Sequence, residues 1–209
     1  FEKIVAKAFD ASPCCARLGT DGAGHYVKMV HNGIEYIDMQ LISEVYHFMR
    51  ESGFSNDEMS RIFSEWNNGE LNSYLIEITS KILRKIDPET GKHLVDVILD
   101  EAEQKGTGKW ASQHSLDLGV PAYSLNMAVF ARMMSASKSE RVSASKLVVR
   151  HPVVIGDKAS FVQQLKEALY AAKICAYAQG FALFSAASKA YNWDIELGKV
   201  AHIWEGGCI

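Results

Sequence analysis

The pattern of apolar and polar residues predicts a chain made almost wholly of helices from Gly24 onward. Apolar side chains recur every three or four residues, as they do along the buried face of a helix. The first long helix is expected over residues 24–51, where Ser52-Gly53 suits its C-terminal end. The second, over residues 160–190, is rich in Ala and Ser and apolar around most of its circumference, which predicts a central position.

Shorter helices fill the sequence between the two long ones. Ser55 or Asn56 can cap a helix that ends at Trp66. The Asp87-Pro88 turn, a flexible basic loop over residues 105–109 and the break at Leu118–Pro121 separate the remaining segments. These helical segments are expected over residues 71–85, 94–105, 124–137 and 139–147.

The N-terminal residues have a different pattern. Residues 1–9 are typical of the end of an amphipathic helix, and Cys14–Leu18 is long enough for one edge strand. A helix and a lone strand cannot form a sheet, so we interpret residues 1–22 as the remnant of an α/β domain. Residues 23–209 then form the helical domain. Phe1 is not an initiator methionine, and we expect the chain to be part of a longer or processed protein.

The two long helices show signs of an internal duplication. Each leads into a short helix that ends in Trp-x-x-Gly, and Trp66 and Trp204 are 138 residues apart, as are Gly69 and Gly207. Identity between the halves is low, and chance remains an alternative. The predicted fold is therefore all-α, with two long central helices in a pseudo-twofold arrangement.

Composition excludes several classes of protein. The net charge is −3, and no basic stripe with interleaved aromatic residues indicates nucleic-acid binding. The apolar runs are too short for a membrane span. Cys14, Cys15, Cys175 and Cys208 have neither the spacing of a zinc site nor that of a disulfide framework. Reduced thiols in a cytoplasmic protein, with no bound metal, are the simplest expectation.

A group of chemically active side chains lies at the start of the first long helix. At 100° per residue, Lys28, His31, Asn32, Glu35 and Tyr36 crowd one side of fewer than three turns. A lysine and a glutamate on one face can exchange protons with a bound molecule if the face is sufficiently buried. An exposed polar stripe with a Lys–Glu ion pair is the alternative, and spacing alone favours it.

Two further features are candidates for binding an anion. The glycine loop at 106–109 frees backbone N–H groups beside Lys105 and Lys109, although a solvated turn explains the pattern as well. Arg132 lies on an otherwise apolar helix and needs an anionic partner, either a phosphate or a structural carboxylate. Neither this loop nor Gly19–Gly24 completes a nucleotide-binding motif, because required glycines are missing.

These residues give the chain a resemblance to the decarboxylating 6-phosphogluconate dehydrogenases. The resemblance covers essentially the whole chain, and the combination of its motifs is highly specific. It implies an all-helical, duplicated domain that dimerises, preceded by the last part of an NADP-binding domain. The matching segments are HYVKMVHNGIEY at 25–36, DMQLI at 38–42, NGELNSYLIEIT at 68–79, QKGTGKW at 104–110, LDLGVP at 116–121, VFAR at 129–132, ERVSASK at 140–146, AYAQGFAL at 176–183 and IWEGGCI at 203–209.

The resemblance also implies an activity, namely oxidative decarboxylation of 6-phosphogluconate to ribulose 5-phosphate with reduction of NADP. Lys28 would be the general base that takes the C3 hydroxyl proton, and Glu35 would protonate C1 of the enediol. With the coenzyme domain absent, the chain is expected to be inactive alone. The implied substrate-binding residues are His31, Asn32, Tyr36, Lys105, Thr107 and Arg132.

Two positions depart from the family pattern. Ile37 replaces a glycine, and a β-branched side chain there could displace a neighbouring helix or the cofactor. Glu205 replaces an arginine near the end of the chain. Two alternatives therefore stay open, a related β-hydroxyacid dehydrogenase and a non-enzymatic helical dimerisation module.

Overall fold

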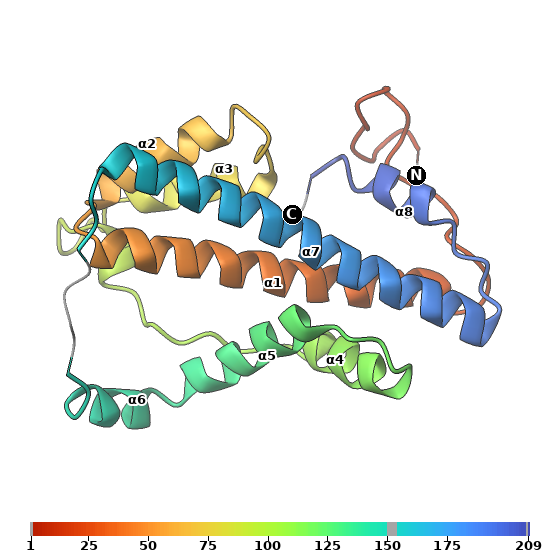
Figure 1. The fold of residues 1–209 in the computed structure, drawn as a ribbon. Helices are drawn as coiled ribbons and strands as arrows, with labels where there is room; N and C mark the ends of the chain where they lie inside the picture. Colours follow the sequence, from red (N-terminus) through yellow and green to blue (C-terminus); the bar gives the residue numbers. More distant parts are fainter. Residues whose placement is uncertain (1, 150–153, 208) are drawn as a thin grey trace. The chain divides into compact units, whose positions relative to one another are not determined.

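The computed structural model describes residues 2–149, 154–207 and 209, and the regular elements among them are helices (Figure 1). This confirms the predicted all-helical class. Phe1 and Cys208 lie outside the described residues. The elements are α1 (Ala23–Glu51), α2 (Asn56–Trp66), α3 (Tyr74–Arg84), the 3₁₀ turn η1 (Leu94–Asp96), α4 (Thr107–Asp117), α5 (Tyr123–Ala136), α6 (Lys138–Ser145), α7 (Lys158–Tyr191) and α8 (Leu197–Ile203).

Local signals set the ends of several helices. After α1, the Phe54 N–H donates to the Met49 carbonyl across Gly53, which closes the last turn. Ser55 caps α2 in a capping box with Glu58, as the Ser55 or Asn56 prediction allowed. The long helices α1 and α7 are confirmed within three residues of their predicted ends.

The prediction for the N-terminal residues was wrong in its elements. Among residues 2–22 the structure contains neither the helix expected over 1–9 nor the strand expected at Cys14–Leu18; an isolated bridge pairs Lys7 with Pro13. Nine residues are too few for a stable helix without a packing partner, and a strand needs a neighbour to complete its hydrogen bonds. Amphipathic spacing alone therefore does not decide the conformation here.

The helix predicted over residues 94–105 was also wrong beyond its first turn. Only η1 forms, and the backbone that follows is held by side chains of later residues. Asp100 pairs with Lys138 and Arg141, and the Ala102 N–H donates to Ser135 Oγ at 2.8 Å. These tertiary contacts replace the hydrogen bonds that a continued helix would have made.

The chain divides into two compact units, and each is described by itself. Unit 1 comprises Phe1–Ile37, Gln104–Val129 and Cys175–Ile209; unit 2 comprises Asp38–Glu103 and Phe130–Ile174. Helices α1, α5 and α7 each contribute residues to both units. Within each unit, the segments of the two long helices α1 and α7 lie side by side (Figure 1).

In unit 1, the contact between α1 and α7 is close and apolar. A Cβ added at Gly180 of α7 would lie 2.4 Å from Ile34 Cδ1, and Ile34 and Val30 are fully buried. The absence of a side chain at Gly180 thus allows the helices to approach. On α7 as a whole, one face is buried while Tyr170 and Ile174 are exposed, so its predicted central position holds for one side only.

In unit 2, the corresponding contact is ionic. Lys173 of α7 donates to Asp38 of α1 at 2.6 Å, and the Asp38 side chain is 2% exposed. The order of a long helix followed by a short one occurs twice, in α1–α2 and in α7–α8. This order agrees with the predicted duplication, which stays a prediction.

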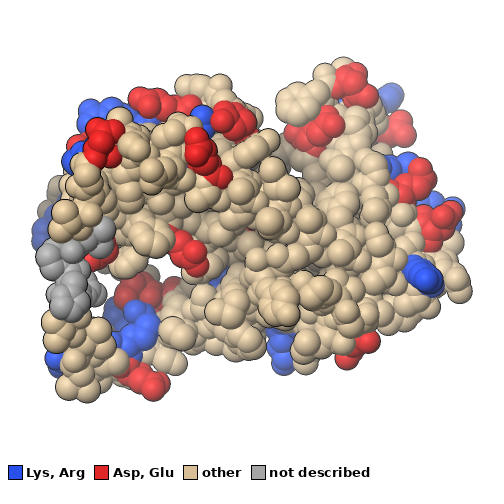
Figure 2. Space-filling view, in the orientation of Figure 1, with Lys and Arg blue, Asp and Glu red and all other residues tan. Residues whose placement is uncertain are grey.

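The surface of the described residues carries charges of both signs. On the face shown in Figure 2, Lys and Arg are interspersed with Asp and Glu. Cys14, Cys15 and Cys175 are free thiols. Among the described helices, none is long and apolar enough to cross a membrane.

Candidate active site

Of the polar residues predicted on α1, Lys28, His31 and Asn32 are in contact with one another in unit 1, and Glu35 and Tyr36 follow on the same side of the helix, with a gradient of burial. His31 is 3% exposed and Tyr36 is 8% exposed. Asn32 and Glu35 are half-buried, and Lys28 is exposed. These residues, the cluster around Lys28, are therefore neither a fully solvated stripe nor part of the apolar core. The exposed Lys28 is accessible to a molecule that binds from solvent.

Helix α4 brings two more predicted residues to this cluster. Asn32 Nδ2 donates to Thr107 Oγ1 at 3.4 Å, and the Lys105 N–H donates to the Tyr36 hydroxyl at 3.3 Å. A Cβ at Gly108 would lie 2.5 Å from Tyr36 Cε2. Glycine at this position therefore allows the first turn of α4 to pack directly on the Tyr36 ring.

The segment predicted as a flexible basic loop is the beginning of α4. Gly106 is its N-cap residue with φ of +103°, a conformation that favours glycine, and Thr107 is the first helical residue. Lys105, just before the helix, is exposed. A helix N-terminus carries partial positive charge and unpaired N–H groups, so this end of the cluster favours an anionic group.

His31 has an unusual electrostatic environment. Its Nδ1 lies 3.3 Å from Lys28 Nζ and 3.4 Å from Asn32 Oδ1. Burial, and secondarily the Lys28 charge, lower the pKa of His31 to about 4, against a smaller opposing effect of Asn32. The imidazole is consequently neutral near pH 7, so it can hydrogen-bond to a cation without repelling it.

Trp204 is a member of the cluster that spacing did not reveal. Its ring meets the His31 ring edge-on, with centroids 4.8 Å apart and an angle of 79° between the planes. Tyr177, Phe181 and Phe184 of α7 contact the other parts of the indole. The sequence contains no local signal for this contact, because α1 and the end of α8 are far apart along the chain.

Arg132, the remaining predicted substrate ligand, belongs to unit 2 and is described with that unit. Its guanidinium donates to the Glu103 carbonyl at 2.8 Å and lies 3.6 Å from Met39 Sδ. It is half-buried, as its position on an apolar helix suggested. Its role as an anion ligand stays a prediction.

The two departures from the family pattern have clear places in the structure. Ile37 is 3% exposed and belongs to the apolar core, and helix α1 continues through this position without a break. Glu205 Oε2 accepts a hydrogen bond from the Phe9 N–H at 2.9 Å, and its Oε1 lies 3.2 Å from His202 Nδ1. Glu205 thus connects α8 to the N-terminal segment.

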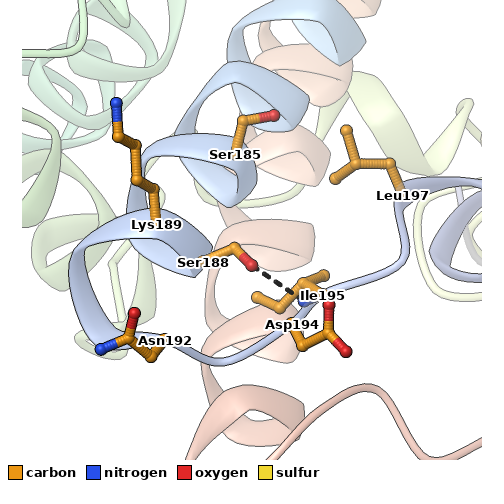
Figure 3. A pocket seen from close by; sticks show the side chains of 7 residues that line it. All are labelled: Ser185, Ser188, Lys189, Asn192, Asp194, Ile195 and Leu197. Atoms are coloured by element: carbon orange, nitrogen blue, oxygen red, sulfur yellow. Dashed lines mark hydrogen bonds between the residues drawn. The ribbon is translucent and has the colours of Figure 1, made fainter.

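A surface pocket of unit 1 lies between the end of α7 and the start of α8, but its polar groups do not converge (Figure 3). Lys189, Asn192 and Asp194 point in different directions, and Ser188 Oγ already accepts from the Ile195 N–H at 2.8 Å. Within the described residues, no three His, Cys, Asp or Glu side chains are grouped as metal ligands. The cluster around Lys28 is therefore the strongest candidate site.

The fold and this cluster together define a class of protein: an all-helical domain with a lysine and a glutamate on one helix, beside the N-terminus of another. Comparison with known sequences gives the particular family. The profile of "6-phosphogluconate dehydrogenase, C-terminal domain" matches residues 24–209. The chain belongs to the 6-phosphogluconate dehydrogenase family.

Individual relatives agree with this assignment. The chain is 57% identical over 211 residues to the NADP(+)-dependent, decarboxylating 6-phosphogluconate dehydrogenase of Bacillus subtilis (strain 168), covering 100% of this chain and 45% of the relative. It is 55% identical over 210 residues to the decarboxylating enzyme of Raoultella planticola, covering 100% and 47%. The chain thus spans about half the length of these curated relatives.

A solved structure supports the fold in detail. The 6-phosphogluconate dehydrogenase of Plasmodium falciparum, solved in its apo form and in complex with NADP+ and with 6-phosphogluconate, superposes with a TM-score of 0.92. The sequences are 45% identical, and the match covers 96% of this chain and 44% of that chain.

Proposed function

We propose that this chain supplies the substrate-binding and acid–base half of an enzyme that converts 6-phosphogluconate to ribulose 5-phosphate and CO₂ with reduction of NADP. The observation that carries the proposal is the junction of α1 with α4. There, a lysine and a glutamate suited to proton transfer lie on the same helix as Asn32 and Tyr36, which contact the anion-favouring first turn of α4.

In this proposal the two ends of the substrate are recognised by different groups. Lys105 and Thr107, at the N-terminus of α4, and the Tyr36 hydroxyl bind the anionic phosphate end. Asn32 and His31 hydrogen-bond to the hydroxyl groups of the sugar acid. Arg132 is proposed as a further ligand of the phosphate or carboxylate.

Lys28 and Glu35 carry the proton transfers. The Lys28 amine takes the proton of the C3 hydroxyl as hydride leaves C3. The resulting ammonium then donates to the carbonyl oxygen on which negative charge develops while CO₂ is lost. Glu35 delivers a proton to C1 of the enediol. The two residues are seven positions apart on α1, so both are on the same helix face.

NADP supplies the hydride acceptor when it is bound. The described residues offer no glycine-rich loop between a strand and a helix, so this part of the chain does not fit the group by itself. We therefore propose that residues outside this sequence hold most of the cofactor, and that residues 1–22 are the end of the domain that does so. Residues 23–209 are the helical substrate domain.

A homodimer is a further part of the proposal. Helix α5 exposes an apolar stripe with helical spacing, whose members are each more than half exposed. A stripe of this kind is typical of a surface that another protein covers. The same stripe favours the alternative of a non-enzymatic dimerisation module, so self-association does not separate the two. The stripe consists of Tyr123, Met127, Phe130 and Met134.

Ligand binding by the chain itself separates the alternatives. We would titrate 6-phosphogluconate and, in parallel, gluconate into the ¹⁵N-labelled chain and follow the amide signals of Asn32, Tyr36 and Thr107. The proposal predicts shifts at these residues with 6-phosphogluconate and a loss of at least about tenfold in affinity with gluconate, because an anion contact is removed. Lys105→Met should reduce the difference in affinity between 6-phosphogluconate and gluconate. Lys81→Met, at an exposed position of unit 2, should leave it unchanged.

The other outcomes assign the chain differently. Equal binding of both ligands at this cluster would favour a related β-hydroxyacid dehydrogenase. No shifts at the cluster with either ligand would contradict the proposal and favour the dimerisation module.

A further inference from the structure

The proposed role of His31 in substrate binding does not account for the contact of its ring with Lys28. Its Nδ1 faces Lys28 Nζ at 3.3 Å and Asn32 Oδ1 at 3.4 Å. The first is a hydrogen-bond donor as an ammonium, and the second is an acceptor. A neutral ring with an unprotonated Nδ1 accepts from the Lys28 ammonium, whereas a doubly protonated ring turns an N–H toward it and cannot.

The position of the imidazole depends on Trp204. The indole meets His31 at 79° and 4.8 Å, a favourable edge-to-face geometry, and covers a ring that is 3% exposed. Trp204 is itself held by Phe181 and Phe184, whose centroids are 5.8 and 5.9 Å away. The end of α8 is thus in contact with the ring that touches the proposed base.

We propose that Trp204 is a positioning residue for Lys28, which acts by holding the His31 imidazole where its Nδ1 accepts a hydrogen bond from the Lys28 ammonium. The inference deepens the proposed function, on which its catalytic consequence rests. The contact itself requires no substrate or cofactor, so it can be tested separately.

Among the residues that the structure describes, few charged groups lie near the ring. On α1, Lys28 is the charged group that affects the pKa of His31. On α4, the neighbouring partner is the uncharged Thr107, reached through Asn32. On α8, His202 and Glu205 flank Trp204 and face each other at 3.2 Å. Removing the indole admits water to the ring, and water favours the imidazolium that repels Lys28.

The test uses NMR of the isolated chain. Two-dimensional ¹H–¹⁵N spectra of the imidazoles report the titration and tautomer of His31, assigned through His31→Asn. The Hε protons of Lys28, assigned through Lys28→Arg, have two distinct shifts when the amine is held and one when it is free. In Trp204→Ala and Trp204→Leu, we expect the pKa of His31 to rise by about one unit or more and the Lys28 Hε signals to merge.

Controls separate positioning from a general loss of structure. Trp204→Phe keeps an aromatic ring at the site. It should therefore retain most of the low pKa of His31 and of the separation of the Lys28 Hε signals. Val200→Ala, a fully buried position on the same helix, should lower the melting temperature without altering the His31 titration.

Two results would overturn the inference. One is an unchanged His31 titration with distinct Lys28 Hε signals in folded Trp204→Ala or Trp204→Leu. The other needs neither variant to fold: if the Lys28 Hε protons keep their separate shifts in His31→Leu, which has no acceptor at this position, the imidazole does not hold the amine. Absence of 6-phosphogluconate binding would refute the proposed function but leave both measurements valid.

Discussion

On α1, the buried imidazole of His31 lies beside the exposed Lys28. An exposed histidine next to a cation would carry a charge at mildly acidic pH and push the lysine away. Burial prevents this in His31, so the Lys28 ammonium retains a hydrogen-bond acceptor 3.3 Å away. The same burial lowers the free energy of unfolding at acidic pH, because the unfolded chain then binds a proton that the folded chain excludes.

Stability should fall as the pH is lowered from about 6.5 to 4. The pKa of His31 is about 4 in the folded chain and about 6.5 when unfolded, so in this range the unfolded chain binds a proton that the folded chain excludes. The resulting free-energy penalty on the folded state is absent above about pH 6.5 and grows by up to about 1.4 kcal/mol per pH unit below it, until it is complete below about pH 4. Urea unfolding at a series of pH values measures this slope.

Substitutions identify the source of the slope. His31→Asn should flatten it, whereas His25→Asn, an exposed histidine on the same helix, should not. Carboxylates with lowered pKa, such as Glu58, contribute mainly below their ordinary pKa of 4.5 and so leave most of the range unaffected. A slope that persists in His31→Asn would show that another group is responsible.

The Asp38–Lys173 pair predicts a large effect of a single charge removal. Asp38 is buried and its Oδ2 has no hydrogen-bond partner, so Lys173 is what compensates its charge. Lys173→Met should destabilise unit 2 by about 3–5 kcal/mol in denaturant unfolding. The double variant Asp38→Asn with Lys173→Met should recover most of the loss, because no uncompensated charge remains.

An exposed pair provides the control for this experiment. Lys81 and Glu77 form an i,i+4 pair on the surface of α3, and Lys81→Met should cost less than about 1 kcal/mol. If Lys173→Met were equally mild, the buried pair would not be important for the contact between α1 and α7.

At the scale of elements, close helix packing depends on positions without side chains. Gly180→Ala would place a Cβ 2.4 Å from Ile34 Cδ1 and should destabilise the chain by about 1–3 kcal/mol. Gly24→Ala, on α1 with nothing within 4 Å of the new Cβ, should be neutral or stabilising by up to about 1 kcal/mol. Equal effects of the two in thermal unfolding would contradict the packing account.

Elements were predictable from the sequence where local chemistry decides them. Ser55 and Gly53 are local signals, and they correctly indicated where α2 begins and α1 ends. Residues 94–105 have a helical pattern too, but Asp100 finds its partners on α6, and no local pattern contains that information.

The candidate site follows the same division. Periodicity along α1 placed Lys28 and Glu35 on one face, and the basic glycine segment pointed to an anion site near Lys105. The contact of Trp204 with His31 joins distant parts of the chain, so it could only come from the structure. Helix α4 as a whole was not predicted, because Gly106 and Gly108 are typical of a loop; in the structure Gly106 is the N-cap residue and Gly108 packs on the Tyr36 ring.

At the scale of the whole molecule, the exposed stripe of α5 predicts self-association. We expect the chain to be a dimer in light scattering after gel filtration, and Met127→Glu with Met134→Glu to make it monomeric, since both side chains are more than half exposed. Ser139→Glu with Ser143→Glu, at two exposed positions of α6, is the charge-matched control. An unaltered mass in the double variant would place the interface elsewhere.

Lys28 and its neighbours are proposed to form the acid–base half of a 6-phosphogluconate dehydrogenase site. The most direct test replaces the matching residues of the Bacillus subtilis relative, which is 57% identical, with this chain. NADP reduction is then measured with 6-phosphogluconate. We predict turnover that Lys28→Met lowers by about 10²–10⁴-fold and Lys81→Met leaves unchanged. A folded hybrid without turnover, or one whose turnover survives Lys28→Met, would contradict the claim.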